Sequence, residues 1–403
     1  MENLSITSAQ KVLFNLVGHN LFGAPLDIPE GVDWKEVIQE SMAQSLPLVA
    51  FKNYRELPID EETKAKLRAF LRKCTASNIS CFKGHGYLHE LMTENAIPYT
   101  VIKGAASSYR YPDPLLRSMG DVDFYVKPEY VERAREIFLA EGFEFDKSEH
   151  PFHLGMVKDS MRLEMHFAPI SAPKGEIGEI FTEYWSDICE RATLTRDVYS
   201  EYYLPSDFHH GFILLTHLRS HMVQQGVGMR HVTDFAVFAN SFSDEEFTEI
   251  FKERLKRVGL WKFAKAVSLA AVILFGMPHR AWMGEDHAIA RALAEDISVG
   301  GNFGRREKSR GLETVFILDY KTTGKARCGI VRAFRAANSI VDRHWGWARK
   351  FPLVYPIGWA YFAIRFLFKR MTGRIDGNVL KSYKQSGERL RLYEGLELFK
   401  PEE

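Results

Sequence analysis

Two aspartates one residue apart, Asp121 and Asp123, stand in DVDFYV, a β-branched and aromatic segment that predicts a strand. Side chains two positions apart on a strand point to the same face, so the two carboxylates are presented together. Like charges this close repel each other unless a cation lies between them. A hard divalent ion with oxygen ligands, such as Mg²⁺, meets that need. The alternative is an edge strand whose outer face carries solvated aspartates.

Residues on either side of this pair favour the metal interpretation. Upstream, Lys103 and Gly104 follow an apolar segment and are followed by small residues. Small residues at such a position allow a phosphate to approach the backbone N–H groups closely. Downstream, Glu164 alternates with apolar residues and shares one face of a second predicted strand with Arg162 and His166. Three carboxylates on neighbouring strands can hold metal ions and a nucleoside triphosphate, and one can act as base for an attacking hydroxyl.

The elements that must position these residues form a compact unit. The sequence predicts a strand at 97–106 that runs into a turn, a strand at 121–127, a helix within 130–145 whose end is marked by Gly142, and a hairpin at 153–167 with its turn near Asp159. Helical patterns precede and follow this unit. We therefore expect an α+β protein whose mixed-sheet core is flanked by N- and C-terminal helical domains.

The same patterns suggest where the domains begin and end. We expect an N-terminal helical domain (1–96), a catalytic core (97–204), a helical domain (205–299) and a C-terminal helical, aromatic and basic segment (300–403).

The segment KGAASSYRYPDPLLRSMGDVDFYV resembles the signature of the nucleotidyltransferase superfamily, which includes DNA polymerase β. It is more closely similar to a branch of uncharacterised bacterial nucleotidyltransferases, over about seventy residues from Pro98 to Pro169. The resemblance implies a polymerase β-like mixed sheet. It also implies that Asp121, Asp123 and Glu164 are catalytic metal ligands for two Mg²⁺ ions, with Mn²⁺ as an alternative.

The resemblance further implies that Gly104 lies in the turn that binds the nucleotide phosphates. Two departures concern this turn. Ala105 replaces the usual Gly or Ser, and the interval from Ala105 to Asp121 is longer than the superfamily pattern. Ser107 or Ser108 would then supply the missing hydroxyl; the alternative is that both serines lie on a helix surface.

The activity that the resemblance implies is attack of an acceptor hydroxyl on the α-phosphate of an NTP such as ATP, with release of pyrophosphate. The acceptor is a small molecule, a protein or RNA. Two alternatives remain: a catalytically silent scaffold that binds a nucleotide or a partner, and a toxin-like enzyme that nucleotidylates tRNA or protein.

Several basic residues near the carboxylates are candidate nucleotide ligands. Lys103 and Arg117 flank the site in sequence and are expected to meet the triphosphate, Arg117 through bidentate contacts. The alternative for Arg117 is an ion pair with the aspartates. His166 shares a face with Glu164 and is expected to orient a ligand or contact the substrate.

A second polar group is predicted on the helices that follow. His217 and His221 have the i, i+4 spacing of a two-histidine metal pair, but HLRSH lacks the glutamate of a metalloprotease motif. Arg230 and Asp234 follow at helical spacing on the next predicted helix. We expect an interdomain hydrogen-bond cluster near the nucleotide; the alternatives are plain core or surface histidines and a zinc site.

The overall composition excludes several classes of protein. Lysine plus arginine number 53 and aspartate plus glutamate 52, so a net charge of +1 does not mark a nucleic-acid or anionic-membrane binder. Four cysteines (Cys74, Cys81, Cys189 and Cys328) form no CxxC pair, which argues against zinc fingers and disulfide scaffolds. The N-terminus does not have the pattern of a signal peptide, and we expect a cytoplasmic protein.

The segment 351–370, FPLVYPIGWAYFAIRFLFKR, is apolar and aromatic but is interrupted by two prolines and Arg365. A helix could begin cleanly only after Pro356, which leaves about a dozen residues, short of the ~20 that a membrane span needs. We expect a buried or interfacial helix and no transmembrane span, with contact to a membrane surface as the alternative.

Two glycine-containing segments are predicted to be connections. Lys83-Gly84-His85-Gly86 echoes the KGAA sequence but lacks a following DxD strand, and it is predicted to be a turn. Gly300–Gly311 is rich in glycine and arginine, and it is predicted to be a basic hinge loop.

Overall fold

A computed structural model describes residues 4–147, 152–170, 172–173, 175–224, 226–300, 329–371, 379–398 and 400–402. The predicted hinge loop that follows Gly300 lies outside these residues.

A five-stranded mixed sheet forms the centre of the predicted catalytic core. Its strands are β1 (Tyr99–Val101), β2 (Val122–Val126), β3 (Glu144–Phe145), β4 (His153–Lys158) and β5 (Met161–His166). The strand order is β1-β2-β5-β4-β3, in which β2 and β5 are parallel and the other neighbours are antiparallel. The aspartate strand and the glutamate strand are therefore direct neighbours, as the resemblance requires.

The sheet has its own hydrophobic core, shared with two helices and a small hairpin. The helices are α4 (Glu61–Glu94) and α6 (Val131–Ala140), and the hairpin pairs β6 (Thr193–Arg196) with β7 (Glu201–Leu204). Phe124 of β2 and Phe138 of α6 are fully buried there, with ring centroids 5.9 Å apart. Val122 and Phe124 face this core, which leaves the opposite face of β2 for the aspartates.

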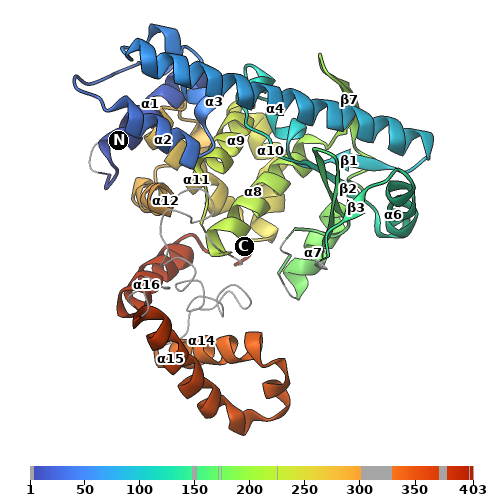
Figure 1. Cartoon of the computed structure of the whole chain (residues 1–403), viewed down its shortest axis with the longest axis vertical. Helices are drawn as coiled ribbons and strands as arrows, with labels where there is room; N and C mark the ends of the chain where they lie inside the picture. The colour runs from blue at the N-terminus through green and yellow to red at the C-terminus, as the bar shows by residue number, and fades with distance from the viewer. Residues whose placement is uncertain are drawn as a thin grey trace.

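Most of the other helices before residue 301 build a larger second core around their apolar faces. They are α1 (Ser8–Phe22), α2 (Trp34–Ala43), α3 (Pro47–Ala50), α7 (Glu176–Trp185), α8 (Asp207–Gln224), α9 (Met229–Asn240), α10 (Asp244–Arg257), α11 (Trp261–Phe275) and α12 (His287–Gly300). Figure 1 shows the long α4 running along one edge of the molecule, from the N-terminal helices to the sheet. The chain is thus a helix-rich α+β protein with a small mixed sheet.

Local signals fix several element boundaries. The carboxylate of Asp60 accepts a hydrogen bond from the backbone N–H of Thr63 and starts α4, and Asp33 caps α2 in the same way. The predicted hairpin is confirmed: β4 and β5 are joined through a turn in which Asp159 has a φ of 53°. The helix end predicted at Gly142 is confirmed: α6 ends at Ala140, Gly142 has a φ of 83°, and the short strand β3 follows.

The turn predicted at Lys83–Gly86 is wrong, because these residues lie inside α4. The glycines serve close packing instead of a change of chain direction. A Cβ on Gly84 would lie 3.2 Å from Cγ2 of Val122, and a Cβ on Gly86 would lie 3.2 Å from Cβ of Ser200. Their small size therefore lets the helix approach β2 and the β6–β7 connection.

Three helices follow the segment that the structure leaves undescribed: α14 (Gly329–His344), α15 (Tyr355–Met371) and α16 (Val379–Gly395). Figure 1 shows α14 and α15 side by side at one end of the molecule. The helix predicted within the segment 351–370 therefore forms as α15, with Pro356 in its first turn. Along α15 a row of apolar side chains is exposed: Ile357, Tyr361, Ile364, Phe368 and Met371. Among the described helices, none combines the length and apolarity that crossing a membrane requires.

Candidate active site

A cavity of about 310 Å³ lies between the sheet and the helices α8 and α9. The predicted site residues all line it: Asp121, Asp123, Glu164, Lys103, Gly104, Ser107, Arg117, His166, His217, His221, Arg230 and Asp234. They come from the turn after β1, the segment before β2, strands β2 and β5, and the two helices. The structure therefore brings the two predicted polar groups into one cavity.

The carboxylates occupy adjacent positions on the two parallel strands. Asp123 on β2 is paired in register with Glu164 on β5, and Asp121 immediately precedes β2. The side chain of Asp123 is 5% exposed and that of Glu164 is 22% exposed. Direct lateral pairing places two acidic side chains on one face at the wall of the cavity.

Two basic side chains neutralise Asp123. The Lys103 ammonium lies 2.6 Å from Oδ1 of Asp123, and Nε2 of His166 lies 3.1 Å from the same oxygen. Burial of the carboxyl acts to raise its pKa, but Lys103 and His166 together hold the pKa of Asp123 below its usual range. Asp123 is therefore ionised in the folded protein.

The other two carboxyls lack equally close cations. Burial and the Asp123 charge raise the pKa of Glu164 from 4.5 to about 7. The Asp123 charge, followed by burial, also raises the pKa of Asp121. A cation bound between these two carboxyls would lower their pKa values, because it would offset the repulsion between their negative charges.

This donor set fits a hard divalent ion. Three carboxyls supply oxygen ligands on one wall, and their mutual repulsion is the feature that a cation relieves. Mg²⁺ needs few protein carboxylates, because it keeps water and substrate phosphate oxygens in its other positions. The residues present therefore suit Mg²⁺ or Mn²⁺.

Gly104 and the short helix α5 (Ala105–Ser108) follow β1, and together they provide a glycine at positive φ and a buried hydroxyl. Gly104 has a φ of 56°, and a Cβ there would lie 3.3 Å from Nε2 of His85, so both the backbone and the space favour glycine. Ser107 is 2% exposed, and its Oγ has no hydrogen-bond partner among the described residues. A buried hydroxyl at the cavity wall is a donor available to a ligand.

Arg117 is engaged by a helix on the other side of the cavity. Its Nε donates to Oδ1 of Asp234 at 2.9 Å, and its Nη2 donates to Oδ2 at 2.8 Å. Tyr111 also donates to Oδ1 of Asp234. The alternative expected for Arg117, an ion pair with Asp121 or Asp123, is therefore wrong for the described residues: its ion-pair partner is Asp234 on α9. Asp234 is therefore committed to Arg117 and Tyr111.

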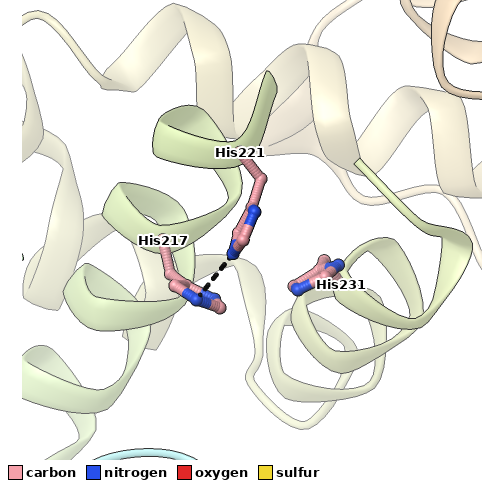
Figure 2. A group of neighbouring side chains, drawn as sticks. All are labelled: His217, His221 and His231. Carbon is pink, nitrogen blue, oxygen red and sulfur yellow. Dashed lines mark hydrogen bonds between the residues drawn. The ribbon is translucent and has the colours of Figure 1, made fainter. Parts of the chain in front are cut away.

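The histidines of α8 meet a third histidine from α9. Nε2 of His221 lies 2.9 Å from Nε2 of His217, and the His231 ring centroid lies 4.8 Å from that of His221 (Figure 2). Arg230, next to His231, donates through Nη1 to the backbone carbonyl of Ser118, before β2. These helices are thus joined to the aspartate segment.

Sequence reasoning missed three residues of this region. Asn78 on α4 donates to the carbonyls of Leu115 and Arg117 and accepts from the N–H of Met119, which fixes the segment before the aspartates. His153 lines the cavity beside Glu164 and His166, and His231 completes the histidine group. The register of the predicted hairpin is the signal that could have indicated His153. The short connection between α8 and α9 is the signal that could have indicated His231.

The comparison with known families agrees with this geometry. Residues 30–276 match a family described as an uncharacterised nucleotidyltransferase. The match covers more than half of the chain and includes every predicted site residue, so the chain belongs to this family. No curated protein and no solved structure matches the chain. Membership supports nucleotidyl transfer as the general activity.

Proposed function

We propose that this protein is a metal-dependent nucleotidyltransferase with a polymerase β-like core, which transfers an NMP group from an NTP to a hydroxyl acceptor and releases pyrophosphate. The observation that carries the proposal is the pairing of Asp123 with Glu164 across parallel strands, with Asp121 beside them, at the wall of a cavity of about 310 Å³. Family membership supports the same reaction class.

Asp121, Asp123 and Glu164 are the proposed ligands of two Mg²⁺ ions, which Mn²⁺ can replace. When bound, the ions would neutralise charge on the phosphate oxygens and on the leaving pyrophosphate. His166 orients Asp123 through its 3.1 Å contact. Glu164 also suits the role of general base for the acceptor hydroxyl, because its carboxyl lies at the wall of the cavity beside the other two.

The proposed nucleotide contacts lie on the same side of the cavity. Gly104 permits a close approach of the backbone to phosphate, and Ser107 offers its hydroxyl. Lys103 is a compact cation for the triphosphate. Arg117 retains N–H donors beyond the two that Asp234 accepts, so it can border the phosphates while it remains paired.

The acceptor would enter between the sheet, within the proposed core domain 97–204, and the proposed helical domain 205–299. Figure 1 shows α8 and α9 beside the sheet. His217, His221 and Arg230 line this side of the cavity. A small-molecule, protein or RNA hydroxyl remains the proposed acceptor class, because specificity in such clefts is set by the variable walls.

The test is label transfer from each α-labelled NTP, with Mg²⁺ and cell extract as the source of acceptor. We expect transfer from an α-labelled and not from a γ-labelled NTP. Asp121→Asn, Asp123→Asn and Glu164→Gln should abolish transfer, whereas Asp146→Asn should not, since Asp146 pairs with Arg162 outside the cavity lining. Unchanged transfer by the three cavity variants would refute the site. Absence of transfer by the wild type with any NTP would refute the reaction.

A further inference from the structure

Three imidazoles converge where the end of α8 meets the start of α9. Nε2 of His217 and Nε2 of His221 are 2.9 Å apart, and one ligand nitrogen of each of His217, His221 and His231 lies within 4.8 Å of the others. Figure 2 shows the three rings gathered around one point, with two coming from adjacent turns of one helix and the third from the next helix.

A backbone contact fixes the tautomer of His231. Its Nδ1 lies 3.3 Å from the carbonyl oxygen of Gly228, and a carbonyl only accepts, so Nδ1 carries the proton. The lone pair of neutral His231 is therefore on Nε2. Histidines that bind metals are commonly oriented by this kind of N–H to carbonyl hydrogen bond.

The spacing of the nitrogens is close to that of a metal site. Bonds of about 2.0–2.1 Å in a tetrahedral zinc centre place its nitrogen ligands roughly 3.3 Å apart. The contact between His217 and His221 would have to widen slightly and the wider contacts would have to shorten, as small side-chain rotations allow. The two facing Nε2 atoms also need either a proton or a cation between them.

The charge state of the cluster suits a metal ligand set. Burial lowers the pKa of His221 to about 4 and holds the pKa values of His217 and His231 well below their usual range, so the imidazoles are neutral. Arg230 is a nearby cation that lowers all three pKa values further, as do Lys103 for His217 and His221 and Arg117 for His231.

We propose that His217, His221 and His231 bind a Zn²⁺-class transition-metal ion, separate from the carboxylate site, with a fourth coordination position open to the shared cavity. Nitrogen ligands select zinc, cobalt or nickel over magnesium, whereas the carboxyl oxygens prefer magnesium. Three protein ligands with one open position is the arrangement of zinc sites that bind a substrate oxygen. In this protein the open position would take the oxygen of the acceptor, and that role rests on the proposed function. The binding of the metal ion itself does not depend on the proposed function.

The first experiment measures zinc content. The full chain is stripped with a chelator, equilibrated with Zn²⁺ in excess Mg²⁺, dialysed and analysed by mass spectrometry of the metal. We expect about one zinc ion per chain, lost in His217→Ala, His221→Ala and His231→Ala. Asp121→Asn should keep the zinc and lose nucleotidyl transfer, which separates the two sites. His209→Gln is the matched control, on α8 but outside the cavity.

The second experiment uses the wild type alone, so it does not depend on the folding of the variants. Co²⁺ added in place of Zn²⁺ should give the intense visible absorption of a tetrahedral nitrogen site. A weak octahedral spectrum would overturn the proposal. So would the absence of retained zinc in the wild type, zinc retained by all three histidine variants, or zinc lost in Asp121→Asn.

Discussion

Arg117 and Asp234 form a buried, two-point ion pair that joins the segment before β2 to helix α9. Both hydrogen bonds are short, at 2.9 and 2.8 Å, and the side chains are 8% and 3% exposed. Both residues line the cavity, so the pair ties the segment that leads to Asp121 to the helix that carries His231.

Removing one partner of this pair should destabilise the protein. Arg117→Ala and Asp234→Ala should each lower the free energy of unfolding by about 3–5 kcal/mol, because each leaves a buried charge without its partner. The double variant should lose less than the sum of the two. Arg117→Lys should not restore stability, since an ammonium cannot make both contacts. Urea denaturation measures these values, and strict additivity would contradict the coupling.

The Glu164 carboxyl should make stability depend on pH when no metal is present. Its pKa is raised from 4.5 to about 7, so the folded protein retains a proton that the unfolded chain has released. This stabilisation is fully present below 4.5 and is lost as the pH rises through 7. The Tm of the wild type relative to Glu164→Gln, measured with a chelator, should therefore fall across that window. A constant difference would be evidence against the shift.

Ser107→Ala should separate binding from folding. The hydroxyl is buried without a partner among the described residues, so its removal should leave stability unchanged or raise it by up to about 1 kcal/mol. The dissociation constant for the magnesium nucleotide should rise roughly 10-fold, since a hydrogen bond to charged phosphate is lost. Thermal unfolding and calorimetric titration provide the two readouts.

The neighbouring Ser108 is the matched control for this prediction. Its Oγ donates to the carbonyl of Ala105 at 2.9 Å. Ser108→Ala should therefore leave nucleotide affinity unchanged. Equal affinities for the wild type and Ser107→Ala would remove Ser107 from the nucleotide site.

The exposed apolar row on α15 makes the membrane-surface alternative testable. Ile357 and Ile364 are 65% and 68% exposed, and Arg365 adds a basic group suited to anionic headgroups. Ile357→Ser with Ile364→Ser should change stability by no more than about 0.5 kcal/mol but reduce co-sedimentation with anionic phospholipid vesicles. Leu139→Ser, an apolar position on α6 that is 52% exposed, is the control. Vesicle binding that does not differ between these variants would exclude α15 as the contact.

The local features of the fold could be predicted because their causes are local. The hairpin turn near Asp159 and the alternation of Glu164 with apolar residues each depend on a few adjacent residues. The partner of Arg117 could not be predicted, because Asp234 is more than a hundred positions away and competes with nearer aspartates. The sequence predicts a turn at Gly84 and Gly86 because the packing that requires these glycines involves Val122 and Ser200, which are distant in the chain.

One helix contributes to both hydrophobic cores. The first half of α4 buries Leu67 and Leu71 among the helices, and its second half buries Phe82 and Leu88 against the sheet. At roughly 1.5 Å per residue its 34 residues span about 50 Å. The helix is therefore a continuous structural element shared by both hydrophobic cores. The two cores should unfold in a single cooperative transition. A protease that cuts α4 should release neither half of the protein as a folded fragment.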